Sequence, residues 1–321
     1  IKTVYTIHNL KFQGRWYVDA IRDVTGLDAS YFTMDKLESY GNANLLKGGV
    51  VYADYVTTVS ETYAKEIQST DGGEGLDGLM RAKSYCLSGI VNGLDYEIFN
   101  PETDPLIAQR FEGDITSYKK ANKLDLQKAT ELNEQEDAFL IGMVSRLTDQ
   151  KGLDLVNSII PQIMDEHTQI VVLGTGDPAY EDSFRYYENA YKGSICSNIM
   201  YDETRAHRIY AGADALLVPS QFEPCGLTQL IAMHYGTIPI VRETGGLKDT
   251  VEPYNMYYNT GNGFTFDRYD AGLLLDAINR AKTLYFTDRW HWDEMVQRDM
   301  DKNLSWDNSA KQYKDLYLEL Q

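Results

Sequence analysis

Two cations lie close together in the segment SRLTDQKG, which follows a continuous apolar run at 139–144. Arg146 offers a planar guanidinium fork for phosphate oxygens, and Lys151 offers a compact positive charge. If residues 139–144 form a strand of an open parallel sheet, both cations belong to its carboxyl end, where such sheets bind ligands. The spacing therefore favours an anion clamp, and the alternative is a pair of ordinary surface cations that form ion pairs.

A second group follows the apolar run at 215–219, in the segment SQFEPCGLT. A helix expected over about 226–235 would present its first N–H groups to an anion, and Gly226 would let a phosphate approach the backbone closely. Glu223 precedes that helix, where a carboxylate is also electrostatically favoured. Because phosphate and carboxylate would compete for one helix end, we expect Glu223 to face a sugar. A simple helix-start acid is the alternative.

Two shorter signals follow other expected strands. The pair His8-Asn9 comes directly after the run VYTI, and a structural histidine is the alternative to a functional one. Gly245 and Gly246 follow the run IPIV, where paired glycines suit either close approach to a ligand or a plain turn. Dinucleotide, P-loop, zinc-protease and serine-hydrolase motifs are absent from the sequence.

The composition restricts the class of partner. A formal net charge of −18 over 321 residues argues against nucleic acid, whose phosphates need clustered Lys and Arg, and favours a neutral main substrate. No apolar run approaches the roughly 20 residues of a membrane helix. The three cysteines show neither metal nor disulfide spacing, which suits a reducing cytoplasm.

The elements that must position these residues alternate in type from about residue 138 onward. Helical patterns separate short apolar runs that are typical of buried strands, at 139–144, 170–173, 198–201, 215–219 and 238–241. Continuous rather than alternating hydrophobicity indicates a parallel sheet with helices on both faces. The cations, Glu223 and the glycine pair then all follow strands at one edge of that sheet.

The rest of the chain suggests how it is divided. Residues 1–92 show a similar but incomplete pattern of strands and helices, and 305–321 form an amphipathic helical stripe. We expect one domain at 1–92, a second at 93–304 and a C-terminal crossover helix at 305–321. Because the chain opens on IKTVYTI, which is typical of the middle of a strand, we expect a fragment that lacks an N-terminal part.

Together these segments resemble the bacterial glycogen synthase and plant starch synthase family. The resemblance follows nearly the whole chain in order, and its most specific parts are FEPCGLTQL at 222–230 and TGGL at 244–247. The other matching segments are TIHNL (6–10), GIVNGLD (89–95), VSRLTDQKGLD (144–154) and GTGD (174–177).

The resemblance implies an α/β fold of GT-B type, with two Rossmann-like domains built on parallel sheets, the first of them truncated here. It implies retaining transfer of glucose from ADP-glucose, or UDP-glucose in some members, to the non-reducing end of an α-1,4-glucan such as glycogen or starch. It implies neither a cofactor nor a metal. The acidic composition and the bacterial likeness favour ADP-glucose as donor.

Residue by residue, the resemblance assigns roles around one donor site. Arg146 and Lys151 are similar to the diphosphate clamp, and Glu223 to the acid that contacts the glucose hydroxyls. His8 is similar to the donor-side histidine near the sugar. The expected remainder of the site comprises Tyr201 as the adenine-stacking residue, the backbone of Gly226, Leu227 and Thr228 as the distal phosphate cradle, and Cys225, Gly245 and Gly246 as cleft-lining residues.

Two departures from the family pattern modify these expectations. The Lys-x-Gly-Gly-Leu loop with which family members begin is not in this sequence, so we expect much reduced activity from this chain alone. Met200 occupies a position where a small residue is common, next to the expected purine pocket. The alternatives are a non-catalytic nucleotide- or glucan-binding fragment and a related GT-B enzyme such as sucrose synthase.

Overall fold

The computed structural model describes all residues from 1 to 321. The chain divides into two compact units, one formed by Ile1–Asn92 with Ser309–Gln321 and the other by Gly93–Asn308. None of the helices combines the length and the apolar character that a membrane crossing requires. Each unit has its own sheet and core, and each is described by itself.

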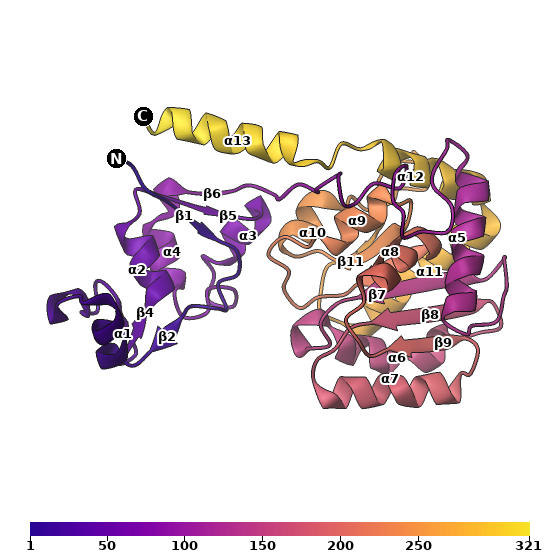
Figure 1. Cartoon of the computed structure of the whole chain (residues 1–321), viewed down its shortest axis with the longest axis horizontal. Coiled ribbons are helices and arrows are strands. Elements are labelled where there is room, and N and C mark those ends of the chain that lie inside the picture. Colours follow the sequence, from indigo (N-terminus) through magenta and orange to yellow (C-terminus); the bar gives the residue numbers. More distant parts are fainter. The chain divides into compact units, whose positions relative to one another are not determined.

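The unit Gly93–Asn308 is built on a six-stranded sheet in the order β12-β11-β10-β7-β8-β9 (Figure 1). All its strand pairs are parallel, which confirms the predicted class of sheet. The strands are β7 (Phe139–Val144), β8 (Thr168–Leu173), β9 (Ile195–Asn198), β10 (Ala215–Val218), β11 (Ile238–Arg242) and β12 (Phe264–Phe266).

Helices cover both faces of this sheet and bury two separate apolar clusters against it. One face carries α6 (Leu153–Ile163), α7 (Pro178–Ala190), α11 (Ala271–Thr287) and α12 (Arg289–Asp301). The other carries α5 (Ile115–Ala129), α8 (Glu203–Gly212), α9 (Thr228–His234) and α10 (Gly245–Thr250). Strands that are buried on both faces need continuous apolar sequence, and this is why β7 reads FLIGMV.

Two predicted boundaries near the candidate site are wrong. Helix α9 begins at Thr228 rather than near Gly226. A 3-10 turn, η3 (Asp149–Lys151), precedes α6, and Gly152 is the N-cap of that helix. The strand expected at 198–201 is Ile195–Asn198, because Met200 N–H turns back to the Asn198 carbonyl at 2.9 Å. Tyr201 therefore belongs to the loop beyond the strand and not to its end.

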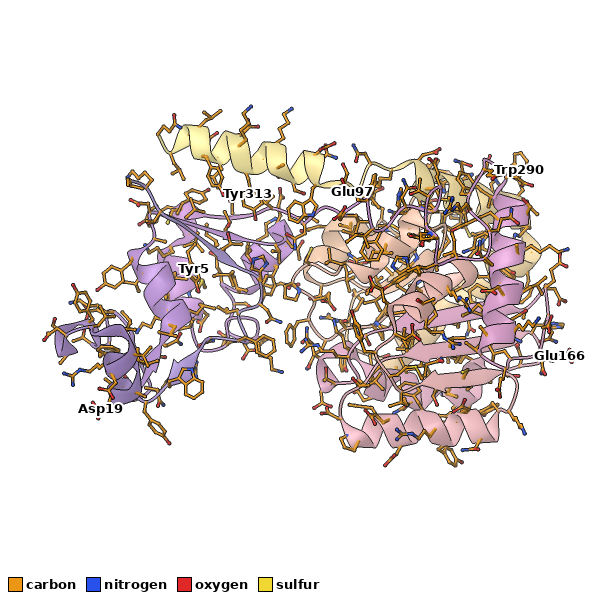
Figure 2. The ribbon with its side chains drawn as sticks, viewed as in Figure 1. Tyr5, Asp19, Glu97, Glu166, Trp290 and Tyr313 are labelled. Atoms are coloured by element: carbon orange, nitrogen blue, oxygen red, sulfur yellow. The ribbon has the colours of Figure 1, made fainter.

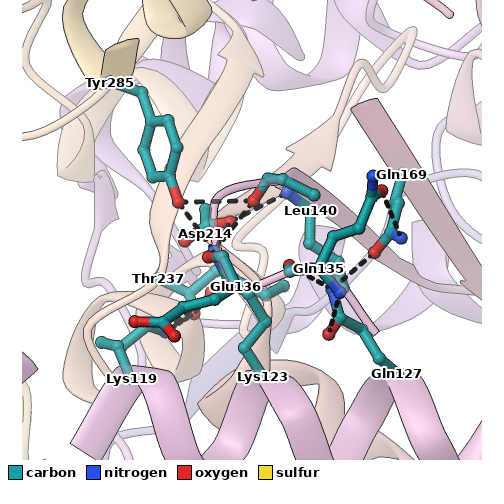
Figure 3. Close-up of polar contacts among 12 residues, drawn as sticks. Lys119, Lys123, Gln127, Gln135, Glu136, Leu140, Gln169, Asp214, Thr237 and Tyr285 are labelled. Atoms are coloured by element: carbon teal, nitrogen blue, oxygen red, sulfur yellow. Dashed lines mark hydrogen bonds and ion pairs between the residues drawn. The ribbon is translucent and has the colours of Figure 1, made fainter. Parts of the chain in front are cut away.

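Polar side chains of α5 anchor this helix to the sheet (Figure 3). Lys119 donates to the carbonyls of Ala211 and Ala213 at 2.8 and 2.7 Å, and Lys123 forms an ion pair with Asp214 at 2.7 Å. Burial lowers the pKa of Lys119 to about 7. One turn further, Gln127 donates to Gln169 at 2.8 Å. These contacts satisfy groups that would otherwise be costly to bury.

The other unit combines a small parallel sheet with an antiparallel ribbon. The parallel sheet has the order β1-β5-β6, and the ribbon, which the sequence did not predict, has the order β2-β4-β3. Ser60 caps α3 by accepting from Tyr63 N–H at 2.9 Å. The elements are β1 (Val4–Ile7), β2 (Arg15–Trp16), α1 (Val18–Thr25), β3 (Glu38–Ser39), β4 (Asn42–Asn44), α2 (Leu45–Tyr52), β5 (Tyr55–Thr58), α3 (Glu61–Glu66), α4 (Asp77–Ala82), β6 (Leu87–Gly89) and, at the other end of the chain, α13 (Trp306–Glu319).

Candidate functional site

The candidate site lies where the strand order of the six-stranded sheet reverses. From β7 the chain proceeds outward to β8 and β9, and it then returns to β10 on the other side of β7. The loops that follow β7 and β10 therefore diverge from adjacent strands and leave a crevice at the carboxyl edge. Arg146 and Lys151 follow β7, and Glu223 follows β10, so the sheet topology brings these predicted residues to one crevice.

Lys151 and Glu223 form an ion pair across this crevice. Lys151 Nζ lies 2.6 Å from Glu223 Oε2, and only 16% and 10% of the two side chains are exposed. Ser220 Oγ donates to the same carboxylate oxygen at 2.9 Å. Glu223 is thus held by two donors from two loops.

Two further hydrogen bonds, one from a side chain and one within the backbone, join the same two loops. Gln150 Nε2 donates to the Phe222 carbonyl at 3.1 Å, and Gln221 N–H donates to the Gln150 carbonyl at 2.8 Å. At Gly152, whose φ is 71°, a Cβ would lie 2.1 Å from the Pro219 carbonyl oxygen. A residue with a side chain would therefore push the loops apart and stretch the Lys151–Glu223 pair.

The glycine pair Gly245-Gly246 packs against the backbone of the loop that carries Glu223, a contact that the sequence analysis did not predict. A Cβ on Gly245 would lie 2.0 Å from the Glu223 carbonyl oxygen, and a Cβ on Gly246 would lie 1.9 Å from that of Cys225. Gly246 N–H donates to the Glu223 carbonyl at 3.1 Å. Both glycines and Cys225 are buried, and this close backbone packing fixes the position of the Glu223 loop.

The first turn of α9 follows this loop. Gly226 has a φ of 69°, which allows the tight turn into the helix, and Leu227 is the N-cap residue. No side chain caps the helix start. The N–H groups of a helix start that lacks a side-chain cap can bind an oxyanion, although the helix begins two residues later than predicted.

Next to these loops lies a cavity of about 350 Å³. Three predicted residues, Arg146, Tyr201 and Thr228, line it together. Tyr201 is 91% exposed, so its ring face is accessible to a planar ligand. Met200 also lines the cavity, beside the expected purine position. Other lining residues include Phe99, Val144, Leu173, His207 and Tyr210.

Sequence reasoning missed a buried polar cluster behind this cavity. His207 Nδ1 lies 2.6 Å from Asp104 Oδ2, and Tyr235 OH donates to the same oxygen at 2.6 Å. The Phe99 ring stacks on His207 at 5.0 Å between centroids. Burial and the neighbouring Asp104 carboxylate raise the pKa of Tyr235. No signal in the sequence could have paired His207 with a residue 103 positions away.

His8 belongs to the other unit and directly follows strand β1. Its side chain is exposed. Asn9 forms a local turn, because its Oδ1 accepts from Lys11 N–H at 3.0 Å and its carbonyl accepts from Phe12 N–H at 3.3 Å. The turn explains Asn9 structurally, and the role of His8 stays a prediction.

Comparisons with known proteins agree with the resemblance that the motifs suggested. Residues 1–82 match the family described as starch synthase catalytic domain, and residues 126–295 match glycosyl transferases group 1. The chain is 54% identical to the glycogen synthase of Lachnospira eligens and 44% identical to that of Clostridium acetobutylicum. Each comparison covers 99% of this chain, with 66% of the first relative and 67% of the second, so the chain spans about two thirds of their length.

Solved structures give the same answer for the fold. The catalytic domain of starch synthase IV from Arabidopsis thaliana, bound to ADP and acarbose, superposes with a TM-score of 0.91 at 35% identity. The match covers 99% of this chain and 66% of that one. A sucrose-phosphate synthase from Thermosynechococcus elongatus shares the fold at 20% identity and a TM-score of 0.63, covering 99% of this chain and 67% of that one. The predicted GT-B class is confirmed, and the chain belongs to the glycogen synthase and starch synthase family of glycosyltransferases.

Proposed function

We propose that the protein transfers glucose, with retention of configuration, from ADP-glucose to the non-reducing end of an α-1,4-glucan. The observation that carries the proposal is the Lys151–Glu223 ion pair at the strand-order reversal, beside the cavity lined by Arg146 and Tyr201. This arrangement offers positive charge, a carboxylate and an aromatic ring in one crevice. A sugar nucleotide presents the complementary groups, which are a diphosphate, a polyol and a base.

The proposed chemistry follows from where charge develops. Breaking the bond between glucose and phosphate builds negative charge on the leaving diphosphate and positive charge on the sugar ring. Arg146, Lys151 and the first N–H groups of α9 would stabilise the first charge, and the Glu223 carboxylate would stabilise the second. Because these groups can neutralise the diphosphate, the proposal includes neither a metal ion nor a cofactor.

The ion pair also suggests how donor binding and chemistry are coupled. In the structure Lys151 is paired with Glu223. A diphosphate that draws Lys151 toward its oxygens would leave Glu223 with Ser220 as its hydrogen-bond donor. The negative charge of the carboxylate would then no longer be neutralised by Lys151, and it would stabilise positive charge on the sugar more strongly. Binding of the leaving group would thus prepare the acid that faces the ring.

The proposed site residues fall into two groups, those that would contact the nucleotide and those that would support the Glu223 loop. Arg146, Tyr201 and Thr228 would contact the nucleotide, with Gly226 and Leu227 shaping the phosphate end. Cys225, Gly245 and Gly246 would act indirectly, by holding the Glu223 loop. His8 is proposed as a donor-side residue from the other unit. The three cysteines are buried and none of them is in a disulfide, which supports the proposal of a cytoplasmic protein.

The experiment is transfer of radiolabelled glucose from ADP-glucose to glycogen, measured in the precipitated polymer. Release of the label by an exo-acting α-1,4-glucanase would place it at non-reducing ends, and Glu223→Gln is the matched inactive control. Label in the polymer that depends on Glu223 supports the proposal. ADP binding without any transfer would favour the alternative of a nucleotide-binding fragment, and transfer that Glu223→Gln leaves unchanged would contradict the assigned role.

A further inference from the structure

The loop between α10 and β12 projects three consecutive large side chains into solvent. Met256, Tyr257 and Tyr258 are 71%, 86% and 79% exposed. Single exposed apolar residues need no explanation, but a contiguous group of them is a candidate interaction surface. The loop is not part of the donor cavity, whose lining comes from other segments.

Hydrogen bonds hold this loop in one shape. Asn255 and Thr260 pair across its base, and Asn255 Oδ1 accepts from the N–H groups of Tyr257 and Tyr258 at 3.0 and 3.3 Å. Asn259 has a φ of 48°, a conformation that asparagine tolerates better than most residues. The two tyrosine rings are therefore presented on a fixed backbone, which lowers the entropy cost of binding to them.

The loop runs alongside α12. Asn259 Nδ2 donates to Glu294 Oε2 at 2.5 Å, and Arg298 Nη2 donates to the Gly261 carbonyl at 3.2 Å. Residues 290, 294 and 298 are one helical turn apart and share a face of α12. Trp290, which is 71% exposed, thus lies on the face of α12 that meets the loop, one turn before Glu294.

This surface is at the opposite edge of the sheet from the donor site. The loop precedes β12, and α12 follows α11, which returns from the carboxyl end of β12, so both belong to the amino edge of the parallel strands. Figure 2 shows Trp290 on the same side of the unit as Glu166, which lies just before β8. A ligand bound here would leave the crevice of Lys151 and Glu223 open.

We propose that Tyr257, Tyr258 and Trp290 form a second glucan-binding surface that anchors the protein to its polymer. Exposed aromatic rings stack on the apolar C–H faces of glucose units, and tyrosine hydroxyls can bond to sugar hydroxyls. Glu294 and Asp293 on the adjacent turn of α12 accept from Asn259 and Arg289 through one oxygen each, and their second oxygens can accept from sugar hydroxyls. The net charge of −18 opposes anionic polymers. The ligand class rests on the proposed function.

Because the anchor lies away from the donor site, it can bind the polymer without blocking the reaction. A polymer with many chain ends can be held at one surface while another of its ends reacts at a distant site. Linking two weak sites on one molecule raises the effective concentration of the second ligand end without any new contact at the active site. The anchor would thus increase affinity for glycogen while leaving the affinity for nucleotide unchanged.

The test is affinity electrophoresis of the whole chain in native gels that contain glycogen. For the double variant Tyr257→Ala/Tyr258→Ala we expect at least about a fivefold weaker retardation constant than for the parent. Tyr186→Ala, which removes a comparably exposed tyrosine from α7, is the matched control and should leave retardation unchanged. Calorimetric titration with ADP should give the same Kd for all three proteins.

Each result decides one proposal. Equal retardation of the double variant and the parent, or no retardation of the parent, would overturn the anchor whatever ADP does. If the parent is a dimer that the double variant converts to a monomer with glycogen retention unchanged, the surface is a contact between copies of this chain and the anchor is wrong. A tyrosine-dependent retardation combined with no ADP binding would support the anchor and count against the proposed donor.

Discussion

Replacing Lys151 with methionine should weaken both the fold and the donor site, and the structure sets the size of each effect. The substitution keeps most of the side-chain volume but leaves Glu223 with Ser220 as its remaining side-chain donor. Breaking a fully buried pair costs about 3–5 kcal/mol. Because 16% and 10% of the two side chains remain exposed, we expect about 2–3 kcal/mol here.

Thermal unfolding followed by circular dichroism measures the first effect. For a unit of this size, a loss of about 2–3 kcal/mol lowers Tm by about 5–10 °C. The double variant Lys151→Met/Glu223→Gln should recover most of this loss, because a neutral amide no longer needs the cation. Recovery would show that the cost comes from the stranded carboxylate and not from altered packing.

Calorimetric titration with ADP measures the second effect. A charge-assisted hydrogen bond contributes about 1.5–3 kcal/mol, so Lys151→Met should weaken ADP binding by about 10- to 100-fold. Glu223→Gln should bind ADP at least as tightly as the parent, since Lys151 would then not have to break an ion pair with Glu223 in order to bind the diphosphate. If Lys151→Met unfolds at the parent's temperature and binds ADP equally well, the reasoning about this ion pair is refuted.

Three further outcomes test other parts of the structure. Tyr201→Ala should weaken ADP binding by about tenfold through loss of base stacking, while Tyr186→Ala on α7 should not. Gly246→Ala should lower Tm and abolish ADP binding, because its Cβ would lie 1.9 Å from the Cys225 carbonyl oxygen, and an unchanged Tm would contradict the close approach. Burial lowers the pKa of His234 to about 4, so the unfolded state binds the proton more readily between about pH 4 and 6.5 and stability is lost as the pH falls through that window. His234→Phe should remove up to about 3 kcal/mol of this acid sensitivity, and equal pH profiles of urea unfolding for variant and parent would count against it.

The sequence predicted the parts of the site that depend on strand order. Continuous apolar runs indicated a parallel sheet, and residues after parallel strands must meet at one edge. This is why Lys151 and Glu223, 72 positions apart, were assigned to one crevice and form an ion pair there. The motif sequences indicated the family. The periodicity of apolar residues predicted most helices and strands of the larger unit.

Features that depend on packing at a distance could not be read from the sequence. Lys119 and Lys123 on α5 are almost completely buried, and this becomes possible only because carbonyls and a carboxylate from other elements surround them. The contact of Gly245 and Gly246 with the Glu223 loop is a backbone approach that paired glycines permit but do not specify. The ribbon strands β2 and β3 have only two residues each, which is too few to show the alternation of apolar and polar residues that identifies a strand in a sequence.

The most direct test of the account is calorimetric titration of the chain with ADP and, separately, with UDP. The cavity beside Tyr201 and the cations at the strand-order reversal predict saturable binding of ADP that is tighter than that of UDP and is weakened in Lys151→Met. Heats that show no saturable binding of either nucleotide, or ADP binding that Lys151→Met leaves unchanged, would contradict the claim that this crevice is the donor site.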